Sequence, residues 1–275
     1  MAAIAQTQPN NEIWYTSASG QKISPKPEVF GANILSNEYD AVAGRGVITF
    51  DDAVRSIGEL AFYQCSDLTS IAIPNCVTSI GKNAFYNCKS LVSVTIPSSV
   101  TSIGERAFQG CSGLVSVSIP SSVTSIGKAI FKDCTGMVSI TIPGNMTGIE
   151  ESTFDGCSGL TSVTIPSSVT QINLWAFDGC SGLSYMVVLP TASPSLGSNV
   201  FYYVPQNIPV FVPNVENYAS WGGFTNIQAY DIIAVKEAAI AVIDATMAGV
   251  TSLTDDDIQA VNNCRSTIGN ETRCH

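Results

Sequence analysis

The sequence repeats with a period of 23 residues, and this period constrains the fold more than any other feature. Six of the nine cysteines stand on the period, each three residues after a phenylalanine and eight residues after an isoleucine. The three columns are Ile57, Ile80, Ile103, Ile126, Ile149 and Ile172; Phe62, Phe85, Phe108, Phe131, Phe154 and Phe177; and Cys65, Cys88, Cys111, Cys134, Cys157 and Cys180. A fixed period of this length is typical of a solenoid, in which each repeat forms one coil and buries its apolar face against its neighbours.

One repeat, residues 91–113, shows how a coil is expected to form. Apolar and polar residues alternate at its start, which predicts a short strand with one buried face. Pro97 ends the strand because it has no backbone donor, and Gly104 allows a later bend. Equivalent strands of stacked coils lie about 4.8 Å apart and hydrogen-bond in parallel. We therefore expect a parallel sheet along one face of a solenoid over residues 48–213.

The repeat reads Leu-x-x-Val-x-Ile-Pro-x-x-Val-x-x-Ile-Gly-x-x-Ala-Phe-x-x-Cys, and this pattern resembles the BspA-like leucine-rich repeats, also called the Treponema pallidum type. The pattern is broken at Met146, where Val is expected, and at Glu150 and Asn173, where the Gly is lost. The resemblance implies a leucine-rich-repeat solenoid. It also implies a non-enzymatic adhesion or binding module at a cell surface, with no catalytic residues to carry over.

Both ends of a solenoid need a cover, because unpaired strand edges promote aggregation. Residues 1–47 are predicted to be an N-terminal cap built on a β-hairpin, with residues 12–16 and 22–24 as its strands. At the other end, residues 214–230 are predicted to close the coil. That segment carries the aromatic residues Tyr218, Trp221 and Phe224.

Residues 231–275 are predicted to form a helical hairpin and a tail. Apolar residues recur at helical spacing from Ile232 to Ile243, and Thr254 followed by three aspartates is a favourable start for a second helix. The hairpin would serve either as a second cap or as an element for attachment. In the second case the chain would form a homo-oligomer or join a larger assembly.

Charge and hydropathy exclude several classes of partner. The formal net charge is -10 and the sequence pI is about 4.4, which opposes binding to nucleic acid or to an anionic membrane surface. No stretch reaches the roughly 18 uninterrupted apolar residues that a membrane span needs. The N-terminus lacks the basic and apolar regions of a signal peptide, although the resemblance implies an extracellular or cell-surface location.

The cysteine column does not predict a metal, cofactor or redox site. Zinc ligands come as close cysteine pairs, and Cys-x-x-Cys is absent. We therefore expect structural free thiols that fill the core. Cys264 and Cys274 lie off the period, and the sequence does not decide whether they form a disulfide. The only histidine, His275, is the last residue, which argues against catalysis that needs an ordered imidazole.

Binding residues are sought where the repeats differ from one another. The exposed columns of the sheet are mostly Ser and Thr, with few of the aromatic and arginine anchors that concentrate binding energy. The columns that follow Ile-Gly and Phe vary more. The candidate contact residues are Tyr63, Tyr86, Arg106, Trp175 and Tyr185.

The sequence thus predicts a non-enzymatic leucine-rich-repeat module that recognises a protein or glycan on a cell or host surface. The alternative is a virion component, such as a phage tail or fibre part, attached through its terminal segments. Neither the ligand nor the oligomeric state follows from the sequence.

Overall fold

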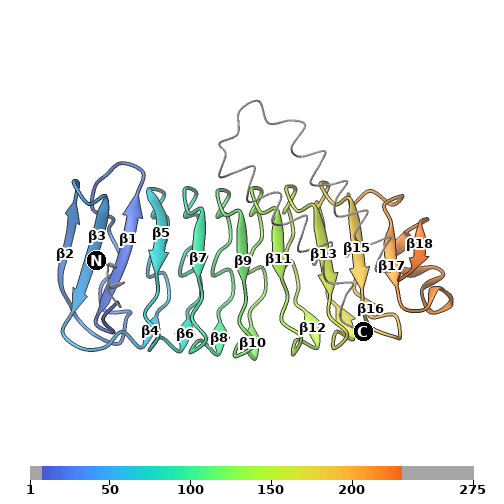
Figure 1. Ribbon diagram of the computed structural model, residues 1–275, viewed down its shortest axis with the longest axis horizontal. Helices are drawn as coiled ribbons and strands as arrows, with labels where there is room; N and C mark the ends of the chain where they lie inside the picture. The colour runs from blue at the N-terminus through green and yellow to red at the C-terminus, as the bar shows by residue number, and fades with distance from the viewer. Residues whose placement is uncertain (1–7, 231–275) are drawn as a thin grey trace, which may run out of the picture.

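The computed structural model describes residues 8–230 of the 275-residue chain. These residues form one elongated solenoid of seven coils, which confirms the leucine-rich-repeat prediction (Figure 1). The predicted helical hairpin and tail, residues 231–275, lie outside the described residues, as do Cys264 and Cys274.

One side of the solenoid, which we call the long sheet, carries a set of parallel strands, one for each coil. These strands are β5 (Leu68–Ala72), β7 (Ser93–Thr95), β9 (Ser116–Ser118), β11 (Ser139–Thr141), β13 (Ser162–Ile165), β15 (Tyr185–Val188) and β17 (Val210–Val212). Equivalent residues pair across neighbouring coils, as in Ser70 with Ser93 and Ser162 with Tyr185. The 23-residue period therefore sets the register of the sheet.

Two-residue strands on a second side of each coil form shorter ladders. They are β4 (Ser56–Ile57), β6 (Ser79–Ile80), β8 (Ser102–Ile103), β10 (Ser125–Ile126), β12 (Gly148–Ile149), β14 (Gln171–Ile172) and β16 (Ser195–Leu196). Their isoleucines point into the core, and Ile57 and Ile172 are fully buried.

A column of stacked phenylalanine rings runs through the core. The rings of Phe62 and Phe85 lie 5.2 Å apart with an interplanar angle of 9°, and those of Phe85 and Phe108 lie 5.0 Å apart. The column ends on Phe201, which stacks on Phe177 at 5.6 Å. Each coil thus buries its apolar residues against the next coil, as expected of a solenoid.

The cysteine column lies beside the phenylalanines, and its thiols hydrogen-bond to the backbone carbonyls of these residues. The Cys88 thiol lies 3.0 Å from the carbonyl of Phe62, and Cys111 lies 3.1 Å from that of Phe85. The same contact recurs at Cys134, Cys157 and Cys180. Each buried thiol therefore donates to a carbonyl of the preceding coil, in addition to filling space.

The N-terminal end of the sheet is formed by three antiparallel strands, β1 (Glu12–Ser17), β2 (Ile34–Asp40) and β3 (Arg45–Phe50). β1 pairs with β3 on one side and with β5 on the other. The predicted hairpin between residues 12–16 and 22–24 is therefore wrong. Residues 22–24 form no strand: two prolines, Pro25 and Pro27, follow directly, and the Ile23 carbonyl accepts from the Asn37 side chain.

The C-terminal end of the described chain is closed by aromatic side chains. It comprises the 3₁₀ helices η1 (Val215–Tyr218) and η2 (Trp221–Gly223) and the strand β18 (Ile227–Ala229), which pairs with β17. Trp221 and Phe224 pack edge-on against Phe201, the last ring of the core column. The buried Tyr218 hydroxyl donates to the carbonyl of Pro190 at 2.7 Å.

The stack of coils is loosened between the fourth and fifth repeats. β11 does not pair with β13, and β10 does not pair with β12, whereas the preceding coils are paired on both sides. The ring of Phe131 lies 5.7 Å from Phe108 and 5.9 Å from Phe154, a wider spacing than in the coils before it. We attribute the wider ring spacing to the buried Ile130, which stands in a column that is alanine in Ala61, Ala84, Ala107 and Ala176. Overpacking of this kind separates neighbouring layers.

Candidate functional site

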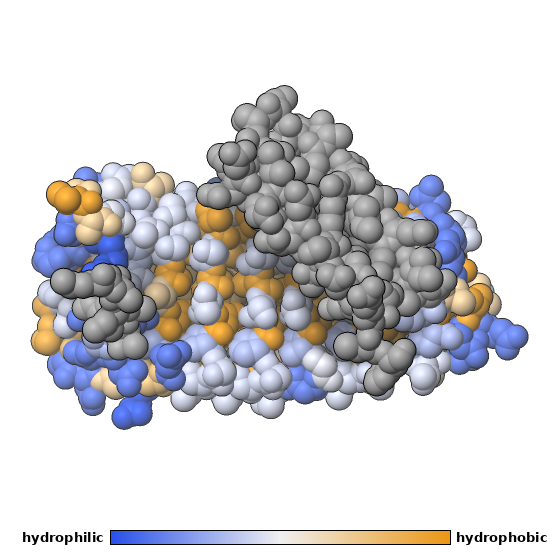
Figure 2. Space-filling model, viewed as in Figure 1, coloured by the Kyte–Doolittle hydropathy of each residue, from blue (hydrophilic) through white to orange (hydrophobic). Residues whose placement is uncertain are grey.

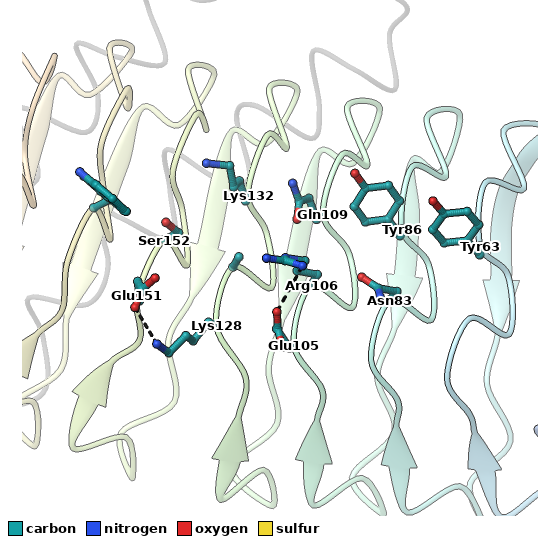
Figure 3. A pocket seen from close by; sticks show the side chains of 12 residues that line it. Tyr63, Asn83, Tyr86, Glu105, Arg106, Gln109, Lys128, Lys132, Glu151 and Ser152 are labelled. Atoms are coloured by element: carbon teal, nitrogen blue, oxygen red, sulfur yellow. Dashed lines mark hydrogen bonds and ion pairs between the residues drawn. The ribbon is translucent and has the colours of Figure 1, made fainter.

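A groove crosses the coils along the side that carries the turns after Ile-Gly and Phe. It has a volume of about 480 Å³. Its lining residues are Tyr63, Asn83, Tyr86, Glu105, Arg106, Gln109, Lys128, Ala129, Lys132, Glu151, Ser152 and Trp175. Figure 3 views the groove with the N-terminal coils at the right, whereas Figure 1 has them at the left. The groove brings together four of the five candidate residues: Tyr63, Tyr86, Arg106 and Trp175.

Aromatic rings occupy both ends of the groove. Tyr63 and Tyr86 come from the first two coils and stack at 5.2 Å with an interplanar angle of 11° (Figure 3). Trp175 comes from the sixth coil, and 39% of its surface is exposed. The groove therefore offers aromatic surfaces at two points separated by four coils. Flat aromatic faces of this kind bind apolar side chains and the apolar faces of sugars.

Charged residues between these ends form ion pairs that cross from coil to coil. The column after Ile-Gly alternates in sign, through Glu59, Lys82, Glu105, Lys128 and Glu151. Lys82 Nζ lies 3.0 Å from Glu105 Oε2, and Lys128 Nζ lies 2.7 Å from Glu151 Oε2. A third pair of the same spacing joins Lys132 to Asp155. The groove is thus polar and nearly balanced in charge between its aromatic ends.

The ion pairs change the titration of their members. The Lys82 ammonium donates to Glu105 and lowers the pKa of that carboxyl below its usual value. The bond from Lys128 to Glu151 raises the pKa of the Lys128 ammonium. Asp178, which follows Phe177, differs: burial raises its pKa first, and the negative charge of Asp155 raises it further. The paired groups therefore stay charged near neutral pH.

Five of the groove residues, Arg106 and Trp175 among them, hold a left-handed backbone conformation. The whole column after Ile-Gly-x has a positive φ, with 56° at both Arg106 and Trp175. This left-handed region favours Gly and Asn, and Asn does occupy the column at Asn83 and Asn199. An arginine or tryptophan costs stability here relative to Gly or Asn. Strained positions that retain large side chains are often binding sites.

The other residues singled out from the sequence lie elsewhere. Tyr185 lies on β15, in the long sheet, half-buried with its ring edge-on to Phe211 at 6.4 Å. Of the cysteine column, Cys65 is half-buried and the other five are buried, and all six are free thiols. Desolvation raises the pKa of Cys111 and of Cys157 to about 12. Such thiols remain protonated and unreactive at neutral pH.

A second hollow, which the sequence analysis missed, lies on the long sheet beside the N-terminal strands. It has a volume of about 500 Å³. Arg45 stacks over the Trp14 ring at 4.4 Å, and Ser70, Ser93 and Thr95 contribute to its floor. No period marks Trp14 or Arg45, because residues 1–47 stand outside the repeats. Only the pairing of β1 with β3 and β5 brings this pair onto the sheet.

Residues 8–230 contain no cluster of three or more histidine, cysteine, aspartate or glutamate side chains arranged to hold a metal ion. Over the same range, no helix is long and apolar enough to cross a membrane.

Comparison with known families identifies the repeat. The model of the BspA type leucine rich repeat region, in six copies, matches residues 45–160 and 124–254. The chain therefore belongs to the BspA-type leucine-rich-repeat family. Members of this family are generally non-enzymatic repeat proteins. No curated protein sequence matches the chain.

Two solved structures are similar to this chain. The leucine-rich-repeat protein of T. pallidum is 25% identical over 73% of this chain and 91% of its own, with a TM-score of 0.54. A leucine-rich cell surface protein from Faecalibacterium prausnitzii is 28% identical over 65% of this chain and 52% of its own, with a TM-score of 0.42. The first similarity supports the fold described above.

Proposed function

We propose that this chain is a non-enzymatic binding module that recognises a protein or glycan on a cell or host surface through the groove. The observation that carries the proposal is the strained placement of Arg106 and Trp175, which both line the groove with φ near 56°. Their side chains are the ones that the fold would least favour at these positions. Contact of both side chains with a ligand would account for their presence at these positions.

The residue types in the groove support the same conclusion. Tyr, Trp and Arg are the residues that most often dominate binding energy at interfaces. Ion pairs such as that of Lys128 with Glu151 hold donors and acceptors in fixed positions along the groove. A ligand with hydroxyl or amide groups can bond to these side chains, while the rings at each end contact its apolar parts.

A location at the cell surface is part of this proposal. One similar solved structure, from Faecalibacterium prausnitzii, is described as a cell surface protein. The flat, uncharged rows of Ser and Thr on the long sheet and the acidic net charge suit an exposed, soluble surface. Nucleic acid and membrane lipid are not expected partners at a net charge of -10.

Binding to intact cells tests the proposal. Fluorescently labelled full-length protein is incubated with bacterial and host cells, before and after treatment with protease or with periodate, which cleaves vicinal diols of sugars. Loss of binding after protease identifies a protein ligand, and loss after periodate identifies a glycan. The Trp175→Asn variant tests the groove, because Asn suits the left-handed backbone and the substitution removes the ring. Equal binding by this variant and the unmodified protein would reject the groove as the site.

The same protein preparation tests the virion alternative. An assembly component is expected to associate with itself, which size-exclusion chromatography with light scattering detects. A chain that binds no cell type and forms defined oligomers would favour a structural role in a particle. A strict monomer that binds cells supports the proposed module.

A further inference from the structure

The second hollow, which we call the sheet hollow, combines Trp14 and Arg45 with a floor of small side chains. Ile13 and Tyr15 are buried, so Trp14 between them points out of the sheet. The partner of Trp14 in the strand pairing is Ala72, whose methyl group keeps the floor low beside the indole ring. Figure 2 shows pale rows of small polar side chains over β7 to β11, which continue this floor along the sheet. A flat ligand therefore has room beside the ring.

The positive charge of Arg45 is unpaired within residues 8–230. Its partner on β2 is Asp40, whose carboxylate accepts from two backbone N–H groups of the β2–β3 turn at 2.8 and 3.0 Å. Glu12, on β1, accepts from the Trp14 indole at 2.6 Å. Arg45 forms no ion pair with any described residue and stacks on the Trp14 ring instead. Stacking leaves the N–H donors at the edge of the guanidinium open to a ligand.

Polar groups with open bonding capacity lie around this guanidinium. Gln8 Nε2 donates to the carbonyls of Glu12 and Ala72 at 2.8 and 3.0 Å, which fixes the side chain and leaves Gln8 Oε1 as an acceptor. The Ser93 hydroxyl, on the floor, makes no hydrogen bond to another described residue. No acidic side chain is among the described residues that line the sheet hollow, and Arg45 is their only basic one. The sheet hollow thus offers one cation, an amide acceptor and a hydroxyl beside an aromatic ring.

We propose that the sheet hollow binds a saccharide that carries a carboxylate, such as a uronic acid or a sialic acid. A guanidinium holds a planar carboxylate through two parallel N–H···O bonds. The amide oxygen of Gln8 and the hydroxyl of Ser93 match the hydroxyl groups of a sugar, and the Trp14 ring offers an apolar face to its C–H groups. A phosphate monoester carries roughly two negative charges, which a single arginine does not balance.

The sheet hollow is less suited to a peptide. An extended peptide binds a sheet by adding a strand at a free edge, and β1 is already paired on both sides, with β3 and β5. β5 pairs in turn with β7, so the backbone of the floor is paired as well. Peptide anchors usually fill apolar pockets, whereas Ser70 and Ser93 make this floor polar. The sheet hollow is also separate from the groove, with which it shares no lining residue.

The indole N–H signals of the full chain test this proposal by proton–nitrogen NMR. Of the three tryptophans, Trp14 reports on the sheet hollow, Trp175 on the groove and the buried Trp221 on neither. The chain is titrated with glucuronic acid and with N-acetylneuraminic acid, and separately with glucose, sodium acetate and a polyglutamate peptide. Arg45→Gln removes the charge from the sheet hollow, and Arg55→Gln removes the same charge from an exposed position outside it.

We expect at least one of the two sugar acids to shift the Trp14 signal saturably and to leave the Trp221 signal unchanged. Arg45→Gln should weaken this binding at least about tenfold, as expected for the loss of a charge-assisted hydrogen bond, whereas Arg55→Gln should bind as the unmodified protein does. An unchanged Trp221 signal in each variant shows that the solenoid remains folded.

Several results would overturn the proposal. They are the absence of any shift at Trp14 with either sugar acid, and binding of glucose or acetate as tight as that of the sugar acids, because recognition would then not need sugar and carboxylate together. Tighter binding of the peptide would assign the sheet hollow to a protein ligand instead. A shift confined to Trp175 would place the sugar acids in the groove, which overturns this inference and leaves the proposed function intact.

Discussion

Replacing Arg106 by asparagine should stabilise the protein and weaken its binding. Arg106 has a φ of 56°, in the left-handed region, where a residue other than Gly or Asn costs about 1–2 kcal/mol. Its ion pair with Glu105 is 3.4 Å long, and the Arg106 side chain is 50% exposed, so its contribution is below about 1 kcal/mol. The expected net gain in unfolding free energy is about 0.5–1 kcal/mol. For a chain of this size the melting temperature should rise by about 1–4 °C.

The reverse substitution is a matched control in the same column. Asn83 has a φ of 53° and also lines the groove, so Asn83→Arg should lower the melting temperature by a similar amount. Thermal unfolding is followed by circular dichroism at pH 7 for both variants and the unmodified protein. A fall in melting temperature for Arg106→Asn, or a rise for Asn83→Arg, would refute the view that this column stores strain. Binding of the Arg106→Asn variant to cells should fall even though its stability rises.

Three further predictions concern stability and core packing. Cys111→Ala should lower the unfolding free energy by about 1–3 kcal/mol, because it removes a buried thiol and its bond to the Phe85 carbonyl, and calorimetry should show this with ligand binding unchanged. Asp178→Asn should raise the melting temperature at pH 7. A raised pKa means that the native state binds the proton more tightly than the unfolded state, so native stability increases as pH falls through the folded pKa. The benefit of Asp178→Asn should therefore disappear near pH 3, and a gain that persists there would contradict the assigned cause. Ile130→Ala should let the rings next to Phe131 approach the spacing of 5.0–5.2 Å seen in the coils before it, which a crystal structure of the variant would test.

The repeat period was enough to predict the solenoid and its core. Side chains that recur every 23 residues must occupy equivalent places in stacked coils, so Phe85 and Phe108 stack, and Cys88 and Cys111 align beside them. The bond from each thiol to a carbonyl of the preceding coil could not be predicted. It depends on the offset of 26 residues between donor and acceptor, which is set by the three-dimensional path of the coil.

The terminal strands were harder to predict because no repeat fixes their register. A strand was expected at residues 12–16, but the partners of β1 lie far along the chain, in β3 and β5. Residues 22–24 resemble a strand because of the apolar Ile23, but Pro25 follows directly and they form none. The same long-range pairing explains why Trp14 and Arg45 were missed as neighbours.

The sequence predicted contact residues but no groove. Variation among repeats indicated Tyr63, Tyr86, Arg106 and Trp175, but the left-handed backbone of the column was overlooked. Asn83 and Asn199 stand in the same column and were the available signal, because Asn is enriched where φ is positive. The larger side chain of Ile130 could likewise be recognised in the sequence, because most equivalent positions are alanine. Tyr185, by contrast, lies on β15 of the long sheet, where the period already places it, 23 residues after Ser162.

The most direct test of the account is the affinity of groove variants for the ligand found on cells. The double variant Tyr86→Ala with Trp175→Asn removes one ring at each end of the groove, and Thr95→Ala with Thr141→Ala makes a matched change on the long sheet. Surface plasmon resonance should show at least about a hundredfold weaker binding for the groove variant, since each lost anchor costs roughly 1.4 kcal/mol or more. The sheet variant should bind as the unmodified protein does. Unchanged affinity in the groove variant, or a comparable loss in the sheet variant, would contradict the assignment of the groove as the binding site.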